Sequence, residues 1–155
     1  GTVGESERMN GTVISDAVNL ASRLEGATKI YHAGIIISED TINKLKMPQK
    51  YYIRFLDKIR VKGKNEPVSI YEVFNGDIES VIEWKESTRK NLQTAIDYYF
   101  AQNFNKALEI LNELHRSKRP GIEDEVVNIY MERCNFLIEN GSPENWDGVI
   151  TMNSK

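Results

Sequence analysis

The sequence predicts an α+β fold, in which strands and helices mix in the first half and helices alone follow in the second. Residues 17–24 place apolar side chains at the spacing of one buried helix face. The β-rich segments 55–61 and 68–74 flank a glycine-containing turn, as expected of a hairpin. Residues 92–138 then repeat apolar stripes of helical period. Strands that precede a run of helices are typical of an α+β arrangement.

The elements of the first half can be placed in order. We expect a strand at 12–14, a helix at 16–26, a strand at 34–37, a helix at 38–45 and the hairpin strands 55–61 and 68–74. Ser15 or Asp16 is a suitable N-cap for the first helix, because its side-chain oxygen can accept a hydrogen bond from a free backbone N–H. Ser38 can cap the second helix, and Pro48 ends it.

Asn19 and Arg23 stand four residues apart and off the apolar stripe, so they are neighbours on one helix face. A guanidinium offers five donors in a planar fork, and beside an amide it suits a polyanion such as a phosphate. The simpler interpretation is that both side chains solvate the outer face of the helix. The spacing alone leaves both interpretations open.

The surroundings of this pair resemble a known family. The motifs are V-N-x-x-x-R around Asn19 and V-K-G-K around Lys62, with the segments 36–41 and 67–73 at matching separations. Together they resemble the C-terminal half of a class III nucleotidyl cyclase catalytic domain over residues 1–74. The resemblance implies a partial ferredoxin-like domain, a βαβ-type half, which we assign to residues 1–76.

The resemblance also implies roles for four residues. Asn19 would help to orient the ribose, and Arg23 would stabilise the charge that develops on the phosphates. Lys62 would bind the triphosphate, although a lysine on a turn is otherwise interpreted as solvated. Thr12 matches a position that helps to choose the purine, and its hydroxyl can bond the exocyclic amine of adenine, so ATP is the expected substrate. Ser15 replaces a common glycine, and because serine caps helices well we expect the site to stay intact.

Class III cyclases use two divalent metal ions, Mg²⁺ or Mn²⁺, held by two Asp residues upstream of the part matched here. We interpret this chain, which lacks an initiator Met, as part of a longer polypeptide. Glu5, Glu7 and Asp16 are interpreted as surface carboxylates. We therefore expect the isolated chain to bind no metal ion and to have no cyclase activity.

The second half predicts a linker at 77–90 that becomes helical and a helical extension at 91–155. Its first two helices resemble one tetratricopeptide repeat, in which the small Ala95 and Ala107 would let them approach closely. A single repeat does not make a free-standing solenoid, so its apolar faces need a cover. Trp146, in a segment like the tail of some bacterial cyclases, is expected to anchor that segment on the helices rather than to bind a peptide.

Composition narrows the function classes. The 155 residues carry a net charge of −3 with interspersed signs, which predicts no nucleic-acid partner. No apolar run approaches the ~18 residues that span a bilayer, so we expect no membrane contact by this segment. The lone Cys134 excludes an internal disulfide, fits a reducing, cytoplasmic compartment and is expected to be a buried structural thiol. His32 and His115 belong to no recognisable triad or metal set.

The expected function is that of an adenylate cyclase, which converts ATP to cyclic AMP and pyrophosphate in intracellular signalling. In this family the active site forms in a dimer, with metal ligands from one protomer and the Asn/Arg pair from the other, so a homodimer is implied. Two alternatives stay open. One is a degenerate cyclase domain that serves as a nucleotide sensor or scaffold, and the other is a helical module that binds a protein partner.

Overall fold

The fold combines a four-stranded mixed sheet, one long helix that lies against it and a group of three further helices. The computed structural model describes residues 2–61 and 66–152, and side chains from residue 17 onward within those ranges. In chain order the elements are α1 (Thr2–Tyr31), β1 (Ile36–Ser38), α2 (Glu39–Asn43), the 3₁₀ turn η1 (Pro48–Lys50), β2 (Ile53–Val61), β3 (Val68–Val73), α3 (Glu79–Phe100), α4 (Phe104–Ser117), α5 (Glu125–Asn140) and β4 (Ile150–Met152). The α+β fold class is confirmed.

The sheet has the strand order β1-β3-β2-β4. Both β1 and β2 pair with β3 in antiparallel fashion, whereas the short β4 lies parallel to β2. The register of β2 against β3 shifts between Phe55 and Asp57, so a β-bulge interrupts the alternation of side chains. As a result Leu56 and Asp57 are both fully buried although they are consecutive.

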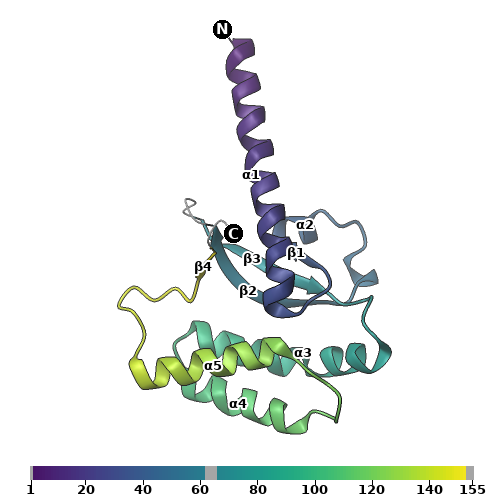
Figure 1. Ribbon diagram of the computed structural model, residues 1–155, viewed down its shortest axis with the longest axis vertical. Coiled ribbons are helices and arrows are strands. Elements are labelled where there is room, and N and C mark those ends of the chain that lie inside the picture. The colour runs from purple at the N-terminus through teal and green to yellow at the C-terminus, as the bar shows by residue number, and fades with distance from the viewer. Residues whose placement is uncertain (1, 62–65, 153–155) are drawn as a thin grey trace.

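Helix α1 differs from the expected structure. A strand at 12–14 and a helix at 16–26 were predicted, but residues Thr2–Tyr31 form one continuous helix of 30 residues. The predicted strand is therefore wrong, and Ser15 and Asp16 lie within the helix instead of capping it. A strand needs a hydrogen-bonded neighbour, and none of the four strands of the sheet pairs with 12–14, whereas helical hydrogen bonds are local. Figure 1 shows α1 crossing the sheet and continuing beyond it.

The other predicted elements lie within a few residues of those in the structure, although α2 ends at Asn43 and Pro48 begins the turn η1 instead of ending that helix. Ser38 caps α2, because its hydroxyl accepts a hydrogen bond from the Thr41 backbone N–H at 3.4 Å. The strands β2 and β3 form the expected hairpin, and the three expected helices follow. The expectation that helices alone make up the second half is wrong, because the segment after α5 returns to the sheet as the short strand β4. No helix in the described ranges is both long and apolar enough to span a membrane.

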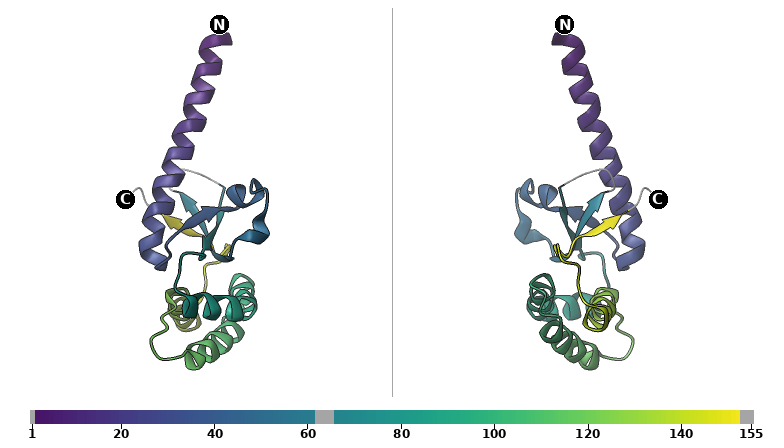
Figure 2. Two further views of the ribbon diagram at one scale, coloured as in Figure 1. Left: turned by 90° about the vertical axis from the view of Figure 1, so that its right-hand side faces the viewer. Right: turned by 90° about the vertical axis from the view of Figure 1, so that its left-hand side faces the viewer.

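The three helices α3, α4 and α5 pack together at the end of the molecule opposite the free end of α1 (Figure 2). Ala95 on α3 and Ala107 on α4 are fully buried, as expected of small residues between close helices. The Trp146 indole donates a hydrogen bond to the Phe100 carbonyl at 2.9 Å, and its ring lies 5.2 Å from that of Tyr99. The prediction that Trp146 anchors the C-terminal segment on the helices is confirmed.

One hydrophobic core runs from α1 through the sheet into the three helices. Buried apolar side chains come from every layer: Ala27 and Tyr31 from α1, Leu56, Ile59 and Ile70 from the strands, and Leu92, Ile96, Leu111, Val126 and Tyr130 from the helices. Cys134 lies in this core with no exposed surface, which confirms the prediction of a buried thiol. The sheet and the helical extension therefore share their interior.

Candidate functional site

Asn19 and Arg23 lie one turn apart on α1, beside the stripe that holds this helix on the sheet. Leu24, Ala27 and Tyr31 follow at helical spacing and pack into the core. Asn19 is exposed, and Arg23 is half-buried. The amide and the guanidinium are therefore neighbours on the helix, as predicted, and the apolar side of the helix packs on the core.

The guanidinium of Arg23 has an unused donor. Its Nε is buried and has no hydrogen-bond partner among the described residues. Buried polar groups are nearly always paired, so an unpaired buried N–H calls for an explanation. A guanidinium binds oxyanions through pairs of N–H donors, and a half-buried arginine one turn from an exposed amide is a residue pair that suits a phosphate group.

The structure does not bring all four predicted residues together. Thr12 lies on α1 instead of a strand, seven residues and about two helical turns before Asn19. Its side chain is not described. Lys62 follows the last residue of β2 and falls outside the described residues. Their contacts with a nucleotide therefore stay predictions.

The donor side chains of the described part do not assemble into a metal site. Among the side chains described, those of residues 17–61 and 66–152, no group of three or more His, Cys, Asp or Glu residues is placed so as to hold a metal ion. These residues do not fit the two-ion site that the family resemblance implies. We therefore assign no metal ligand to them.

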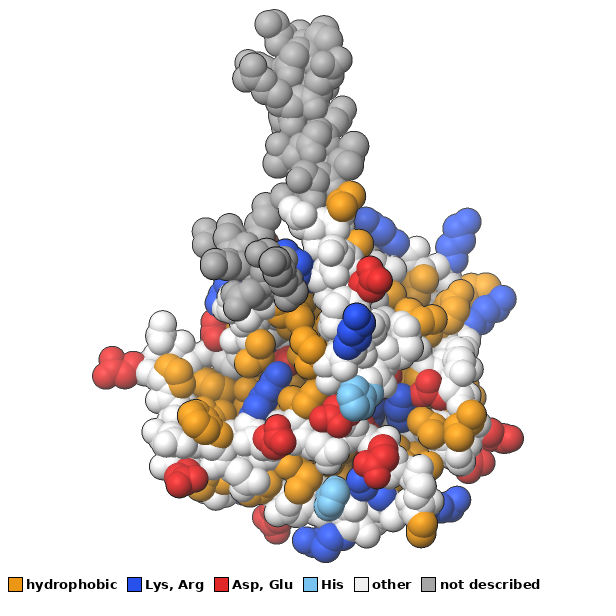
Figure 3. All heavy atoms as spheres, viewed as in Figure 1, with side chains coloured by type: hydrophobic (Ala, Val, Ile, Leu, Met, Phe, Trp, Pro, Cys, Tyr) orange, Lys and Arg blue, Asp and Glu red, His pale blue; other side chains and the backbone are white. Residues whose placement is uncertain are grey.

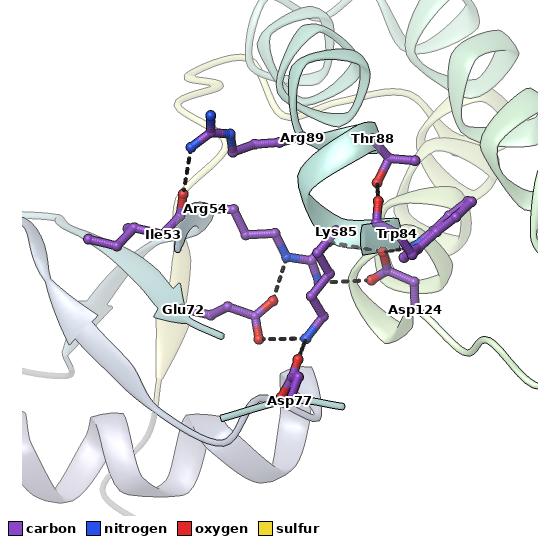
Figure 4. A network of polar contacts seen from close by, with 9 residues as sticks. All are labelled: Ile53, Arg54, Glu72, Asp77, Trp84, Lys85, Thr88, Arg89 and Asp124. Carbon is purple, nitrogen blue, oxygen red and sulfur yellow. Dashed lines mark hydrogen bonds and ion pairs between the residues drawn. The ribbon is translucent and has the colours of Figure 1, made fainter. Parts of the chain in front are cut away.

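Sequence reasoning missed a buried network of charges around Arg54, which Figure 4 shows. The Arg54 guanidinium donates two hydrogen bonds, of 2.9 and 3.0 Å, to the Asp124 carboxylate, and its Nε donates to Glu72. Lys85 joins the other oxygen of Glu72 at 3.1 Å and contacts Asp77 at 2.6 Å. The network thus ties β2 and β3 to α3 and to the residue that precedes α5.

Electrostatics in this network favour the charged forms. Burial alone would lower the pKa of Arg54, but the carboxylates of Asp124 and Glu72 outweigh it and raise that pKa. Burial would raise the pKa of Asp124, but Arg54 and the Trp84 indole hydrogen bond hold it below its usual value. Since the Arg54 guanidinium donates to these carboxylates, the network is structural and offers no evident anion site. The sequence signal was the presence of charged residues inside two β-strands.

Charges on the surface are mixed. On the face drawn in Figure 3, side chains of both signs lie among small hydrophobic groups, with no large area of one sign among the described residues. A basic surface for nucleic acid is therefore not evident on this face.

Comparison with known proteins relates part of this chain to adenylate cyclases. The chain is 51% identical over 74 residues to an adenylate cyclase of Anabaena cylindrica, a match that covers 47% of this chain and 15% of that protein. The chain carries an adenylate cyclase-related region. It is also 38% identical over 73 residues to adenylate cyclase 1 of Rhizobium meliloti, covering 47% of this chain and 11% of that protein. No family model matches the chain, and no solved structure gives a significant match.

A third relative is similar to this chain over a span that includes two of the three helices of the second half. The terminal-differentiation-specific adenylate cyclase of Dictyostelium discoideum is 34% identical over 138 residues, which cover 86% of this chain and 6% of that protein. Since 86% of 155 residues is about 133, the matched span includes α3 and α4 wherever it begins. The similarity to that relative therefore covers strands and helices alike. The chain spans 6–15% of the length of these three relatives.

Proposed function

We propose that this chain supplies the Asn–Arg part of a class III adenylate cyclase active site, with ATP as the substrate. The relationship to three proteins named adenylate cyclase supports the reaction class. The observation that carries the assignment is the buried, unpaired Nε of Arg23, one helical turn from the exposed Asn19.

The proposed chemistry assigns each residue a separate task. Ring closure joins a ribose hydroxyl oxygen to the phosphate that is retained and breaks the bond to pyrophosphate, so negative charge grows on the phosphate oxygens. Arg23 stabilises that charge, and Asn19 holds the ribose so that its hydroxyl faces the phosphorus. Lys62 binds the triphosphate as a point charge, and the Thr12 hydroxyl accepts a hydrogen bond from the exocyclic amine of adenine.

The complete enzyme is proposed to be a cytoplasmic homodimer, because ATP is a cytoplasmic substrate and the Asn–Arg pair needs metal-binding residues from another protomer. Mg²⁺ or Mn²⁺, when bound, would neutralise charge on the leaving pyrophosphate. The described residues do not fit such a site, so the ligands are proposed to come from elsewhere in the protein. It follows that this chain alone should be inactive.

The test is cyclic nucleotide production by the chain extended upstream to a whole catalytic domain, with ATP and GTP supplied separately and either metal ion present. Arg23→Ala and Asn19→Ala should each lower kcat by ~10²–10³, as expected when one preorganised transition-state contact is lost, with a much smaller change in KM. Lys29→Ala, an exposed cation on the same helix, is the matched control and should leave kcat unchanged.

Two outcomes would contradict the proposal. If both substitutions weakened ATP binding as much as they slowed turnover, Asn19 and Arg23 would be ground-state contacts rather than a transition-state pair. If a folded dimer formed no product from either nucleotide, the chain would instead belong to a degenerate domain that senses nucleotides or acts as a scaffold.

A further inference from the structure

A second buried cluster joins α1 to the helical extension through one carboxylate. Asp57, at the bulge in β2, has no exposed surface. Its Oδ2 accepts a hydrogen bond of 2.6 Å from the hydroxyl of Tyr31, the last residue of α1. The same oxygen lies 2.7 Å from the Arg133 guanidinium on α5. One carboxylate oxygen is therefore shared by the helix of the candidate site and a helix of the extension.

The other oxygen of Asp57 is also occupied. It accepts a hydrogen bond of 2.8 Å from the Lys58 backbone N–H and lies 3.2 Å from the Tyr130 hydroxyl on α5. That hydroxyl makes a shorter hydrogen bond, of 2.6 Å, to the Leu56 carbonyl at the bulge. The Arg133 guanidinium in turn lies 5.0 Å from the centre of the Tyr130 ring. The bulge is thus fastened to α5 by two residues one turn apart.

The energetics make this cluster sensitive to the loss of any member. A buried carboxylate is costly unless its partners are all in place, and removal of one partner of a buried pair leaves an uncompensated charge. Burial would lower the pKa of Arg133, but Asp57 outweighs it and raises that pKa, so the cation persists. Burial and the charge of Asp57 raise the pKa of Tyr31, so its hydroxyl stays a donor.

The cluster lies at the C-terminal end of α1, the helix that also carries Asn19 and Arg23. Tyr31 is eight residues, about 12 Å along the helix, from Arg23. Near the same end, His32 Nδ1 lies 3.7 Å from the carboxylate of Glu125, the first residue of α5. A small shift where α1 meets α5 would therefore displace Asn19 and Arg23. A misplacement of about 1 Å can lower a rate ~10²-fold.

We propose that Asp57, held by Arg133 and Tyr130, is a positioning residue through which the helical extension sets where α1 presents Asn19 and Arg23. Its consequence for turnover rests on the proposed function, because the placement of these side chains matters only if they act on the nucleotide. The extension would then be part of the active-site scaffold as well as a candidate surface for a protein partner.

Hydrogen exchange on this chain tests the mechanical half of the proposal. Arg133→Met keeps the bulk of the side chain but removes its charge, and Tyr130→Phe removes a single hydroxyl in case the first variant does not fold. Each should speed amide exchange in residues 24–31 by roughly tenfold relative to α4, since a loss of about 1.4 kcal/mol is a factor of ten in opening. Arg133→Lys should restore part of the protection.

Trp84→Phe is the matched control for exchange. It removes one buried donor from Asp124 in the other network, whose hydrogen bonds reach none of the α1 side chains that the structure describes. It should leave the ratio of exchange in α1 to that in α4 unchanged. Equal effects of Trp84→Phe and Tyr130→Phe on α1, or no effect of either Arg133→Met or Tyr130→Phe, would overturn the coupling.

Turnover in the whole catalytic domain tests the functional half. Arg133→Met should lower kcat at least tenfold with KM for ATP changed less than twofold, Arg133→Lys should recover part of kcat, and Trp84→Phe should have no effect. A uniform loss in all three variants would reduce the cluster to a stability element. If the unmodified domain makes no cyclic AMP, the proposed function fails, whereas the exchange ratios still decide the coupling.

Discussion

Charged residues inside the sheet help to specify how the sheet packs against the helices. Arg54 and Asp57 on β2 and Glu72 on β3 are all buried, at positions where strands usually place apolar side chains. Arg54 and Asp57 have partners of opposite charge in the helical extension, and Glu72 has one in Lys85 on α3. Such residues contribute little net stability compared with apolar substitutes. They disfavour any other packing of the helices on the sheet, because that packing would leave a buried charge unpaired.

Arg54→Met is expected to lower the free energy of unfolding by about 3–5 kcal/mol, because it leaves Asp124 and Glu72 without their main cation. Urea denaturation followed by tryptophan fluorescence would measure this loss. Arg89→Met is the comparison, since Arg89 forms a half-exposed pair with Glu86 and one hydrogen bond of 3.3 Å to the Ile53 carbonyl, and its loss should cost about 1 kcal/mol. Similar losses in the two variants would show that the buried network contributes no more than a surface pair.

Stability should fall at alkaline pH. Burial raises the pKa of Cys134 from 9.0 to about 11, and burial together with Asp57 raises the pKa of Tyr130. The folded chain therefore keeps protons that the unfolded chain releases above pH 9, and the free energy of unfolding should drop by on the order of 1 kcal/mol per pH unit between pH 9 and 11. Denaturation series at pH 8, 9.5 and 10.5 would measure the slope.

Cys134→Ala provides the comparison for this slope. The variant should be less stable at pH 8, because a buried side chain becomes smaller, but its stability should fall less steeply above pH 9. An identical slope in both proteins would mean that the thiol is not the titrating group.

At the scale of elements, the segment that joins α5 to β4 depends on one glycine. Gly148 has a φ of +72°, and a Cβ there would collide with the Phe100 ring, lying 2.6 Å from its Cε1. Gly148→Ala should therefore combine backbone strain with a steric clash and lower stability by about 2–4 kcal/mol. Thermal denaturation of the variant would measure the effect.

Gly141 offers the matched control for this substitution. Its φ is +82°, and a Cβ at this position would have no heavy atom within 4 Å beyond its chain neighbours, so Gly141→Ala should cost only the conformational strain of about 1–2 kcal/mol. A loss at Gly148 no larger than that at Gly141 would show that the Phe100 ring moves aside freely.

The sequence predicted those elements whose signals are local. The hairpin, the Ser38 cap and the three helices follow from periodicity and short-range chemistry, as does the adjacency of Asn19 and Arg23. Arg54 and Asp124 are 70 positions apart, and no local pattern pairs them. The same holds for the bulge at Asp57. The predicted strand at 12–14 failed because β-branched residues favour a strand only where another strand is available to pair.

For the whole molecule, the shared core predicts a single cooperative unfolding transition. A division into 1–76, 77–90 and 91–155 describes the composition well, but both buried networks cross it. A chain ending at residue 76 would leave Asp57 without Arg133 and Arg54 without Asp124. We expect this shorter chain not to fold in isolation.

The amide region of a nuclear magnetic resonance spectrum would check this expectation. Residues 1–76 should give poorly dispersed signals, whereas the 155-residue chain should give dispersed ones and coincident transitions by fluorescence and circular dichroism. A well-dispersed spectrum from the shorter chain would show that the sheet and α1 fold independently of the extension.

The last strand has a consequence for how such proteins can be recombined. Ile150–Met152 pairs with Ile59–Val61. The polypeptide that leaves the sheet for the helices therefore returns to the sheet and covers the end of β2. A chimaera that exchanged the helices and β4 for another module would leave the backbone N–H and C=O groups of Ile59–Val61 on that side unpaired. Unpaired groups on an edge strand can pair with a strand of another molecule. A replacement module would have to bring its own closing strand, so inheritance of the helices as one block with the sheet is the simpler evolutionary route.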